Sequence, residues 1–139
     1  MTVDDIWERA RVGDELPPLQ FEITRTTLAL DIIGTHDTYP IHHDHEFAHA
    51  VGVRDIFLNT QWYQGAIGRF ATNWAGPGSY LRKLAITLRA PSCPGDVLII
   101  RGTITAKREM GTQQLVDMTV TIDGKEPDSV IAKTTVQVL

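Results

Sequence analysis

The stretch NTQWYQGAIGRFATN, residues 59–73, has the apolar spacing of one long helix. Its apolar side chains recur three and four residues apart on one broad stripe: Trp62, Tyr63, Ala66, Ile67 and Phe70. Asn59 or Thr60 can cap the first turn with a side-chain oxygen. The sequence GPG at residues 76–78 ends the pattern, because glycine and proline do not continue a helix. We therefore expect a central amphipathic helix with a wide face to bury.

The chain beyond this helix alternates apolar and polar side chains, which is the pattern of half-buried strands. Four such stripes occur in succession: residues 84–88, 98–106, 116–122 and 130–138. Turn residues separate them at Pro94-Gly95, Gly111 and Asp123-Gly124, and the last pair predicts a tight hairpin. We expect four long antiparallel strands with one apolar face, which the central helix has to cover.

Two shorter elements precede the central helix. Residues 21–24 indicate a first edge strand, and a short helix is expected from about residue 26 to residue 33, ending at Gly34. The sum is a single α+β domain over residues 1–139, in which a curved antiparallel sheet wraps one long helix. This arrangement is the hot-dog fold. Because it leaves a sheet edge exposed, we expect the chain to pair with a second copy.

Composition limits the classes of function. The chain has 139 residues, 42% hydrophobic and 22% charged, which fits one ordinary globular domain. Its net charge of −4 argues against nucleic acid as a partner, and no apolar run approaches the ~20 residues that span a membrane. The first residues, MTVDDIWERA, lack the apolar region of a signal peptide, and the single Cys93 cannot form an internal disulfide. We therefore expect a cytoplasmic protein.

All five histidines lie between residues 36 and 49, in the connection before the central helix. Asp37 and His42 lie close in sequence, and Pro40 stiffens the loop between them. Such a loop can bring a carboxylate and an imidazole to one water molecule, with one group accepting and the other donating a proton. An alternative left open is an Asx turn, in which Asp37 bonds its own backbone and His42 only packs.

The same segment contains HEFAH at residues 45–49, a match to the HExxH pattern that binds zinc when it lies on a helix. Pro40 and Gly52 leave room for only about two helical turns, and no long apolar stripe is present to bury such a helix. We favour a short polar helix capped by Asp44 and expect no metal. A zinc metalloprotease is kept as an outlying alternative.

GTHDTYPIHHD, residues 34–44, together with Ala48 and Gly52, resembles the hydratase motif of MaoC-like (R)-specific enoyl-CoA hydratases. The likeness also takes in VGDELP at residues 12–17, the central helix and the closing strands. It implies a hot-dog fold and the hydration of a trans-2-enoyl-CoA to the 3-hydroxyacyl-CoA. It also implies that no cofactor is needed, with CoA entering as part of the substrate.

The resemblance implies a role for each site residue. Asp37 and His42 correspond to the Asp and His of the family, which grip one water molecule. We expect His42 to take the proton of the water, and Asp37 to orient it and to mediate proton delivery to Cα. The oxyanion donor of the family is a backbone N–H at the start of the central helix, and the matching positions are Asn59 and Thr60. We expect the Thr60 N–H to be this donor, since a helix N-terminus supplies it whatever the side chain.

The chain departs from the family motif beside the aspartate. Thr35-His36 stands where the family has Ser-Gly, and Tyr39 stands where it has Asn. The bulk of Tyr39 is expected to reshape the pocket. We expect Tyr39, Asn59 and Trp62 to contact the substrate.

DIFLNT at residues 55–60 and NWAGP at residues 73–77 are similar to the small subunit of actinobacterial steroid side-chain enoyl-CoA hydratases. In that subgroup the small chain carries the Asp/His dyad and pairs with a second MaoC-like chain that lacks it. The resemblance implies a bulky, steroid-like acyl group and a homodimer or a heteromer with a second MaoC-like chain.

Two further alternatives remain. The chain is a non-catalytic partner subunit kept for assembly or acyl binding, or it is a hot-dog thioesterase. The thioesterase is disfavoured because it needs a carboxylate on the central helix, and residues 61–73 contain neither Asp nor Glu.

Overall fold

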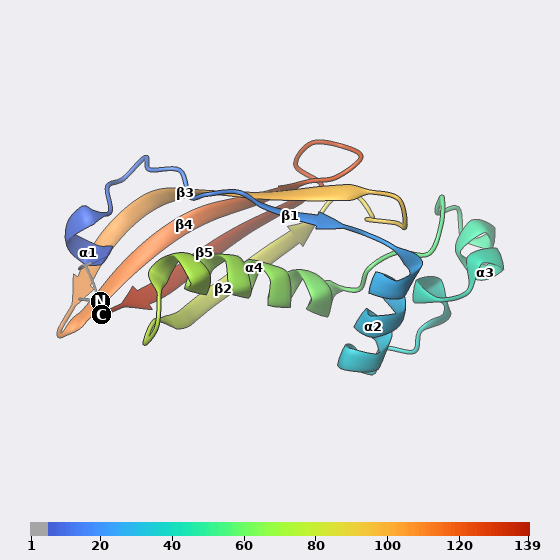
Figure 1. The fold of residues 1–139 in the computed structure, drawn as a ribbon, viewed down its shortest axis with the longest axis horizontal. Coiled ribbons are helices and arrows are strands. Elements are labelled where there is room, and N and C mark those ends of the chain that lie inside the picture. Colours follow the sequence, from blue (N-terminus) through green and yellow to red (C-terminus); the bar gives the residue numbers. More distant parts are fainter. Residues whose placement is uncertain (1–5) are drawn as a thin grey trace.

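The central helix α4 spans Thr60–Ala75 and lies inside the curve of the sheet in the computed structural model (Figure 1). Asn59 is its N-cap, and the side-chain oxygen of Asn59 accepts the Trp62 N–H at 3.0 Å. The helix ends at Gly76, which adopts a φ of 79°. The expected central helix is confirmed, and it extends slightly beyond residue 73 because glycine is reached only at residue 76.

In the described part of the chain, five antiparallel strands form one sheet in the order β1-β3-β4-β5-β2. Their bounds are β1 Leu19–Glu22, β2 Tyr80–Leu88, β3 Val97–Met110, β4 Gln113–Asp123 and β5 Val130–Val138. The apolar stripe of β4 is fully buried in the same core as the apolar face of α4: Val116, Met118, Val120 and Ile122. The sheet and the helix therefore cover each other as the alternating pattern predicts.

Four short helices complete the described chain, and three of them form the connection before α4. They are α1 Ile6–Arg9, α2 Arg25–Thr35, the 3-10 helix η1 Pro40–His42 and α3 His45–Ala50. Figure 1 shows α2 and α3 at the end of the molecule from which α4 starts. The histidine-rich segment is thus held beside the N-terminus of the central helix.

Helix α2 is longer than the sequence indicates. It begins after Thr24, whose side chain forms a capping box with Thr27, and it continues through Gly34. Gly34 does not stop the helix, since an interior glycine costs only about 1 kcal/mol. The chain leaves the helix at His36, which has a left-handed φ of 57°. The expected stop at Gly34 is therefore wrong.

Two other local predictions need correction. The expected first edge strand is present, but it lies at residues 19–22 rather than 21–24. Asp123-Gly124 does not form a two-residue hairpin, because residues 124–129 form a longer loop. The Asp123 side chain accepts the Asp128 N–H at 2.9 Å, and Asp128 has the left-handed φ of 50°. Asp128 thus takes the left-handed conformation in this loop.

The structure describes residues 6–139. No helix in that range has the length and apolar content needed to cross a membrane. Residues 1–5, part of the stretch in which we expected no signal peptide, lie outside the described residues.

Gly102 of β3 provides a test of how the helix packs on the sheet. A Cβ at Gly102 would lie 2.6 Å from Phe70 Cε1 on α4, closer than side-chain atoms pack. Gly102→Ala is therefore expected to lower the free energy of unfolding by about 1–3 kcal/mol in urea denaturation.

Gly65→Ala on α4 is the matched control. Its Cβ meets no described atom within 4 Å, and alanine favours a helix over glycine by about 0.5–1 kcal/mol. Equal destabilisation by both substitutions would contradict the close approach of α4 and β3.

Candidate active site

His42 lies in η1, is 8% exposed as a residue, and has its ring edge-on to the ring of Phe57. Its Nδ1 is 2.7 Å from the Phe57 carbonyl oxygen. Because a carbonyl oxygen only accepts, Nδ1 carries the hydrogen, and Nε2 keeps its lone pair in the neutral ring. The backbone therefore fixes His42 in the tautomer that can act as a base through Nε2.

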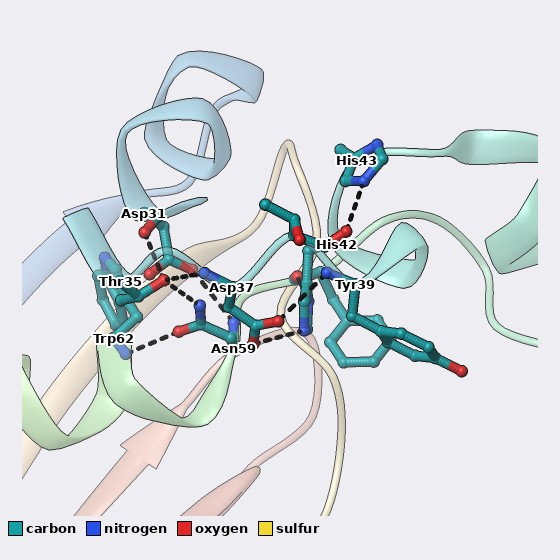
Figure 2. Close-up of polar contacts among 10 residues, drawn as sticks. Asp31, Thr35, Asp37, Tyr39, His42, His43, Asn59 and Trp62 are labelled. Atoms are coloured by element: carbon teal, nitrogen blue, oxygen red, sulfur yellow. Dashed lines mark hydrogen bonds and ion pairs between the residues drawn. The ribbon is translucent and has the colours of Figure 1, made fainter. Parts of the chain in front are cut away.

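Asp37 lies between α2 and η1, and Figure 2 shows its carboxylate facing His42. Asp37 Oδ2 is 3.4 Å from His42 Nε2, and Oδ1 accepts the Tyr39 N–H at 3.3 Å. The Asp37 N–H donates to Thr35 Oγ1 at 3.4 Å. The Asx turn that the sequence left open is therefore present, and it aims the carboxylate at His42. We refer to Asp37 and His42 as the dyad.

The dyad places two hydrogen-bond acceptors opposite each other, a carboxylate oxygen and a lone-pair nitrogen. One water molecule can donate a hydrogen to each, which leaves the lone pairs of its oxygen free to attack. The imidazole can take one of these protons as the attack proceeds. This geometry suits acid–base chemistry on a water molecule.

Asn59 uses its N–H and both polar atoms of its side chain at the start of α4. Its N–H donates to Asp31 Oδ2 at 3.2 Å, and its Nδ2 donates to Thr35 Oγ1 at 2.7 Å. Its Oδ1 caps the Trp62 N–H, and the residue is only 2% exposed. The next donor along the chain is the Thr60 N–H, which belongs to the first turn and has no helical acceptor. Thr60 rather than Asn59 therefore offers a backbone donor at this helix terminus.

A pocket of about 310 Å³ adjoins this network between α2 and α4. Its apolar wall includes Phe21, Trp62 and Ala66. Trp62 packs edge-on against Phe21 with 5.2 Å between ring centroids. Tyr39 lies elsewhere, 55% exposed and edge-on to the ring of His42. The structure thus places Trp62 in a pocket wall and Tyr39 beside the dyad, while Asn59 serves the helix cap.

Sequence reasoning assigned no role to three residues of this network, namely Asp31, Thr35 and Phe57. Asp31 and Thr35 lie one turn apart on α2, and Thr35 Oγ1 donates to the Asp31 carbonyl oxygen at 2.7 Å. Two polar residues four apart on one helix were the available sign of a shared face. Phe57 contributes a backbone carbonyl, for which no side-chain pattern exists. Burial raises the pKa of Asp31, which the Asn59 N–H and His42 lower in part.

The HEFAH stretch forms α3, a helix of six residues with Asp44 as its N-cap. His45 Nδ1 lies 2.7 Å from Asp55 Oδ1, and His49 Nε2 lies 2.8 Å from a backbone carbonyl oxygen. Over residues 6–139, no three His, Cys, Asp or Glu side chains gather in an arrangement that could hold a metal ion. The structure therefore has a short polar helix here, with each imidazole bonded to a protein oxygen.

The fold and the site define a class of protein, a hot-dog domain with an Asp–His pair beside the start of its central helix. No family model matches the chain. The 3-oxo-4,17-pregnadiene-20-carboxyl-CoA hydratase beta subunit of Mycobacterium tuberculosis (strain ATCC 25618 / H37Rv) is 33% identical over 95 residues. These residues are 68% of this chain and 74% of that relative.

Solved structures agree with this match. A chain in the crystal structure of the ChsH1-ChsH2 complex from Mycobacterium tuberculosis is 28% identical, with a TM-score of 0.86 over 94% of this chain and 99% of that one. The (R)-hydratase from A. caviae involved in PHA biosynthesis is 19% identical, with a TM-score of 0.83 over 95% of this chain and 99% of that one, and shares the fold. The chain belongs to the family of MaoC-like hydratases.

The hydrogen bonds of Asn59 make a prediction about stability. Asn59→Ala removes the helix cap and the donor to Thr35 Oγ1, and is expected to lower the free energy of unfolding by about 1–3 kcal/mol. Urea denaturation measures this loss. Thr60→Ala is the control, because the Thr60 side chain is exposed and its removal is expected to change stability by no more than about 0.5 kcal/mol. A loss no larger for Asn59→Ala than for Thr60→Ala would contradict the network.

Proposed function

We propose that this chain hydrates a trans-2-enoyl-CoA to the 3-hydroxyacyl-CoA, with the dyad activating the water. The observation that carries the proposal is the 3.4 Å approach of Asp37 Oδ2 to His42 Nε2, with Nδ1 occupied by the Phe57 carbonyl. In this arrangement one water molecule can contact both a base, His42, and an orienting carboxylate, Asp37. Membership of a hydratase family gives the same reaction type.

The reaction adds one water molecule across the Cα=Cβ bond. His42 Nε2 takes a proton from the water as its oxygen bonds to Cβ, and Asp37 holds the second O–H. The π electrons move to the thioester oxygen, giving an enolate that the Thr60 N–H stabilises. The proton on His42 then passes to Cα, with Asp37 mediating its delivery, and the thioester carbonyl re-forms. The atoms balance without a metal or redox cofactor, so we propose that none takes part.

The proposed acyl group is bulky and ring-bearing, in the manner of steroid side-chain substrates. The named substrate of the 33% identical relative supports this, since it is a pregnadiene carboxyl-CoA. The wall of the pocket between α2 and α4 offers aromatic and aliphatic contacts from Phe21, Trp62 and Ala66 for such a group.

We also propose that the chain works with a second MaoC-like chain. The relative is a beta subunit, and the 28% identical structure is of a two-chain complex. Strand β2 ends the sheet, so its outer backbone groups are available to pair with another strand. The same facts favour a second candidate function, a non-catalytic subunit that supports an active partner.

Substitution of the dyad separates these two functions. Asp37→Asn keeps an oxygen for the Tyr39 N–H but loses the carboxylate, and His42→Ala loses the base. Each is expected to lower kcat by about 10²–10⁴-fold, the usual contribution of acid–base catalysis. The assay follows loss of enoyl-thioester absorbance with short, long and steroid-type 2-enoyl-CoAs, with and without the second chain and a chelator.

His43→Ala is the matched control, since His43 is exposed and its Nε2 bonds the Thr38 carbonyl oxygen at 3.0 Å, away from the dyad. It is expected to retain activity. Full activity of Asp37→Asn in the assembled complex would replace the catalytic role with the supporting one. Activity lost with chelator would move the chemistry to the histidines of α3.

Thr60→Pro tests the oxyanion donor separately. Proline is well accepted at the first helical position, and the extended Asn59 backbone, with φ −82° and ψ 170°, suits a residue before proline. The substitution deletes the N–H and is expected to lower kcat by about 10²–10³-fold while the helix stays intact by circular dichroism. Thr60→Ala keeps the N–H and is expected to keep kcat, so equal activity of the two variants would exclude this donor.

A further inference from the structure

Asp31 is a buried carboxylic group that the proposed reaction does not use. It lies on α2, is 6% exposed, and its Oδ2 accepts the Asn59 N–H at 3.2 Å. Its Oδ1 is buried and has no hydrogen-bond partner among residues 6–139. Figure 2 shows Asp31 on α2 close to Thr35, Asn59 and Trp62. Burying a polar atom without a hydrogen-bond partner costs free energy, so the presence of Asp31 at this position needs an explanation.

The surroundings of Asp31 favour its uncharged form. Burial raises its pKa most strongly, and the negative charge of Asp37 raises it further. The Asn59 N–H and His42 act in the opposite direction but do not outweigh burial. Arg69 of α4 lines the adjoining pocket, where its guanidinium stacks over the Phe21 ring at 5.7 Å.

Asp31 also joins the two halves of the site. Its carboxyl holds the Asn59 N–H at the start of α4, directly before Thr60. Its carbonyl oxygen holds Thr35 Oγ1, which in turn receives the Asp37 N–H. One residue of α2 is therefore bonded, directly or through one hydroxyl, to the helix terminus and to the turn of the dyad.

We propose that Asp31 is a positioning residue of this site. By joining α2 to the start of α4, it fixes the position of the Thr60 N–H relative to Asp37. The role rests on the proposed hydration. Burial makes a negative charge on Asp31 less favourable, and the charge of Asp37 acts in the same direction. The positioning role needs only the carboxyl oxygen that accepts the Asn59 N–H.

The test compares Asp31→Leu with Asp31→Asn in the assembled enzyme. Leucine removes the acceptor of the Asn59 N–H, which is expected to displace the neighbouring Thr60 N–H. The kcat is therefore expected to fall about tenfold to a hundredfold, with KM little changed. Asparagine restores an acceptor oxygen and cannot ionise. It is expected to recover most of the kcat that leucine loses, which a residue needed only for packing would not show.

Thr35→Val serves where Asp31→Leu fails to fold. It removes the hydroxyl between Asn59 and Asp37 but leaves the Asp31 carboxyl in place. Its kcat is expected to fall with KM little changed. Ile33→Asn, on the same helix and 70% exposed, is the surface control with unchanged kinetics.

Unfolding provides a readout that does not need the reaction. A raised pKa in the folded chain means that stability from Asp31 is present below its ordinary pKa of 3.8 and is lost as pH rises through the folded value. The stability of Asp31→Asn relative to the parent chain should therefore grow over that window. No growth would contradict the raised pKa of Asp31 in the folded chain.

The outcomes separate the two proposals. Turnover by the parent chain, with the parent value of kcat in both Asp31→Leu and Asp31→Asn, would overturn the positioning role and leave the hydratase intact. Lower stability of Asp31→Leu with unchanged kcat would show a merely structural residue. Absence of turnover by the parent chain with its partner, on every enoyl-CoA, would overturn the proposed function and the positioning role together.

Discussion

Asn59 joins three parts of the molecule through three hydrogen bonds at one buried point. Its side-chain oxygen caps α4, its N–H is held by Asp31, and its side-chain amide is held by Thr35. Breaking any of them would leave a buried polar group unpaired, at a cost of about 1–3 kcal/mol. Because Thr35 also receives the Asp37 N–H, the end of α2, the start of α4 and the loop that carries Asp37 have one fixed arrangement.

The backbone of residues 57–60 sets the geometry on which the proposed chemistry depends. The Phe57 carbonyl selects the His42 tautomer, and the Thr60 N–H is a donor of the first helical turn, which has no acceptor within the helix. The His42 imidazole and the Thr60 N–H are thus both placed by peptide groups of one short segment. Asn59 between them is fixed by its own hydrogen bonds, so the two groups are held relative to each other. The buried sheet and α4 supply the rigid support for this segment.

Local periodicity in the sequence was enough to predict the main elements of the fold. The alternation in β4 and the helical spacing in α4 report burial directly, and both were confirmed. The loop spacing predicted that Asp37 and His42 lie close together, and the structure places Asp37 Oδ2 3.4 Å from His42 Nε2. The predicted helix end at Gly34 and the predicted tight hairpin at Asp123-Gly124 were wrong. Whether a glycine ends an element depends on hydrogen bonds formed elsewhere in the chain. The Phe57 carbonyl was beyond prediction, since a backbone group leaves no trace in residue identity.

The two carboxyl groups near the start of α4 are kept apart in character by their surroundings. Asp37 is half-buried and faces an imidazole, whereas Asp31 is buried, and burial raises its pKa. Burial makes a negative charge on Asp31 less favourable, while its Oδ2 accepts the Asn59 N–H. The bracing role proposed for Asp31 depends on this hydrogen bond, which an asparagine oxygen could also accept.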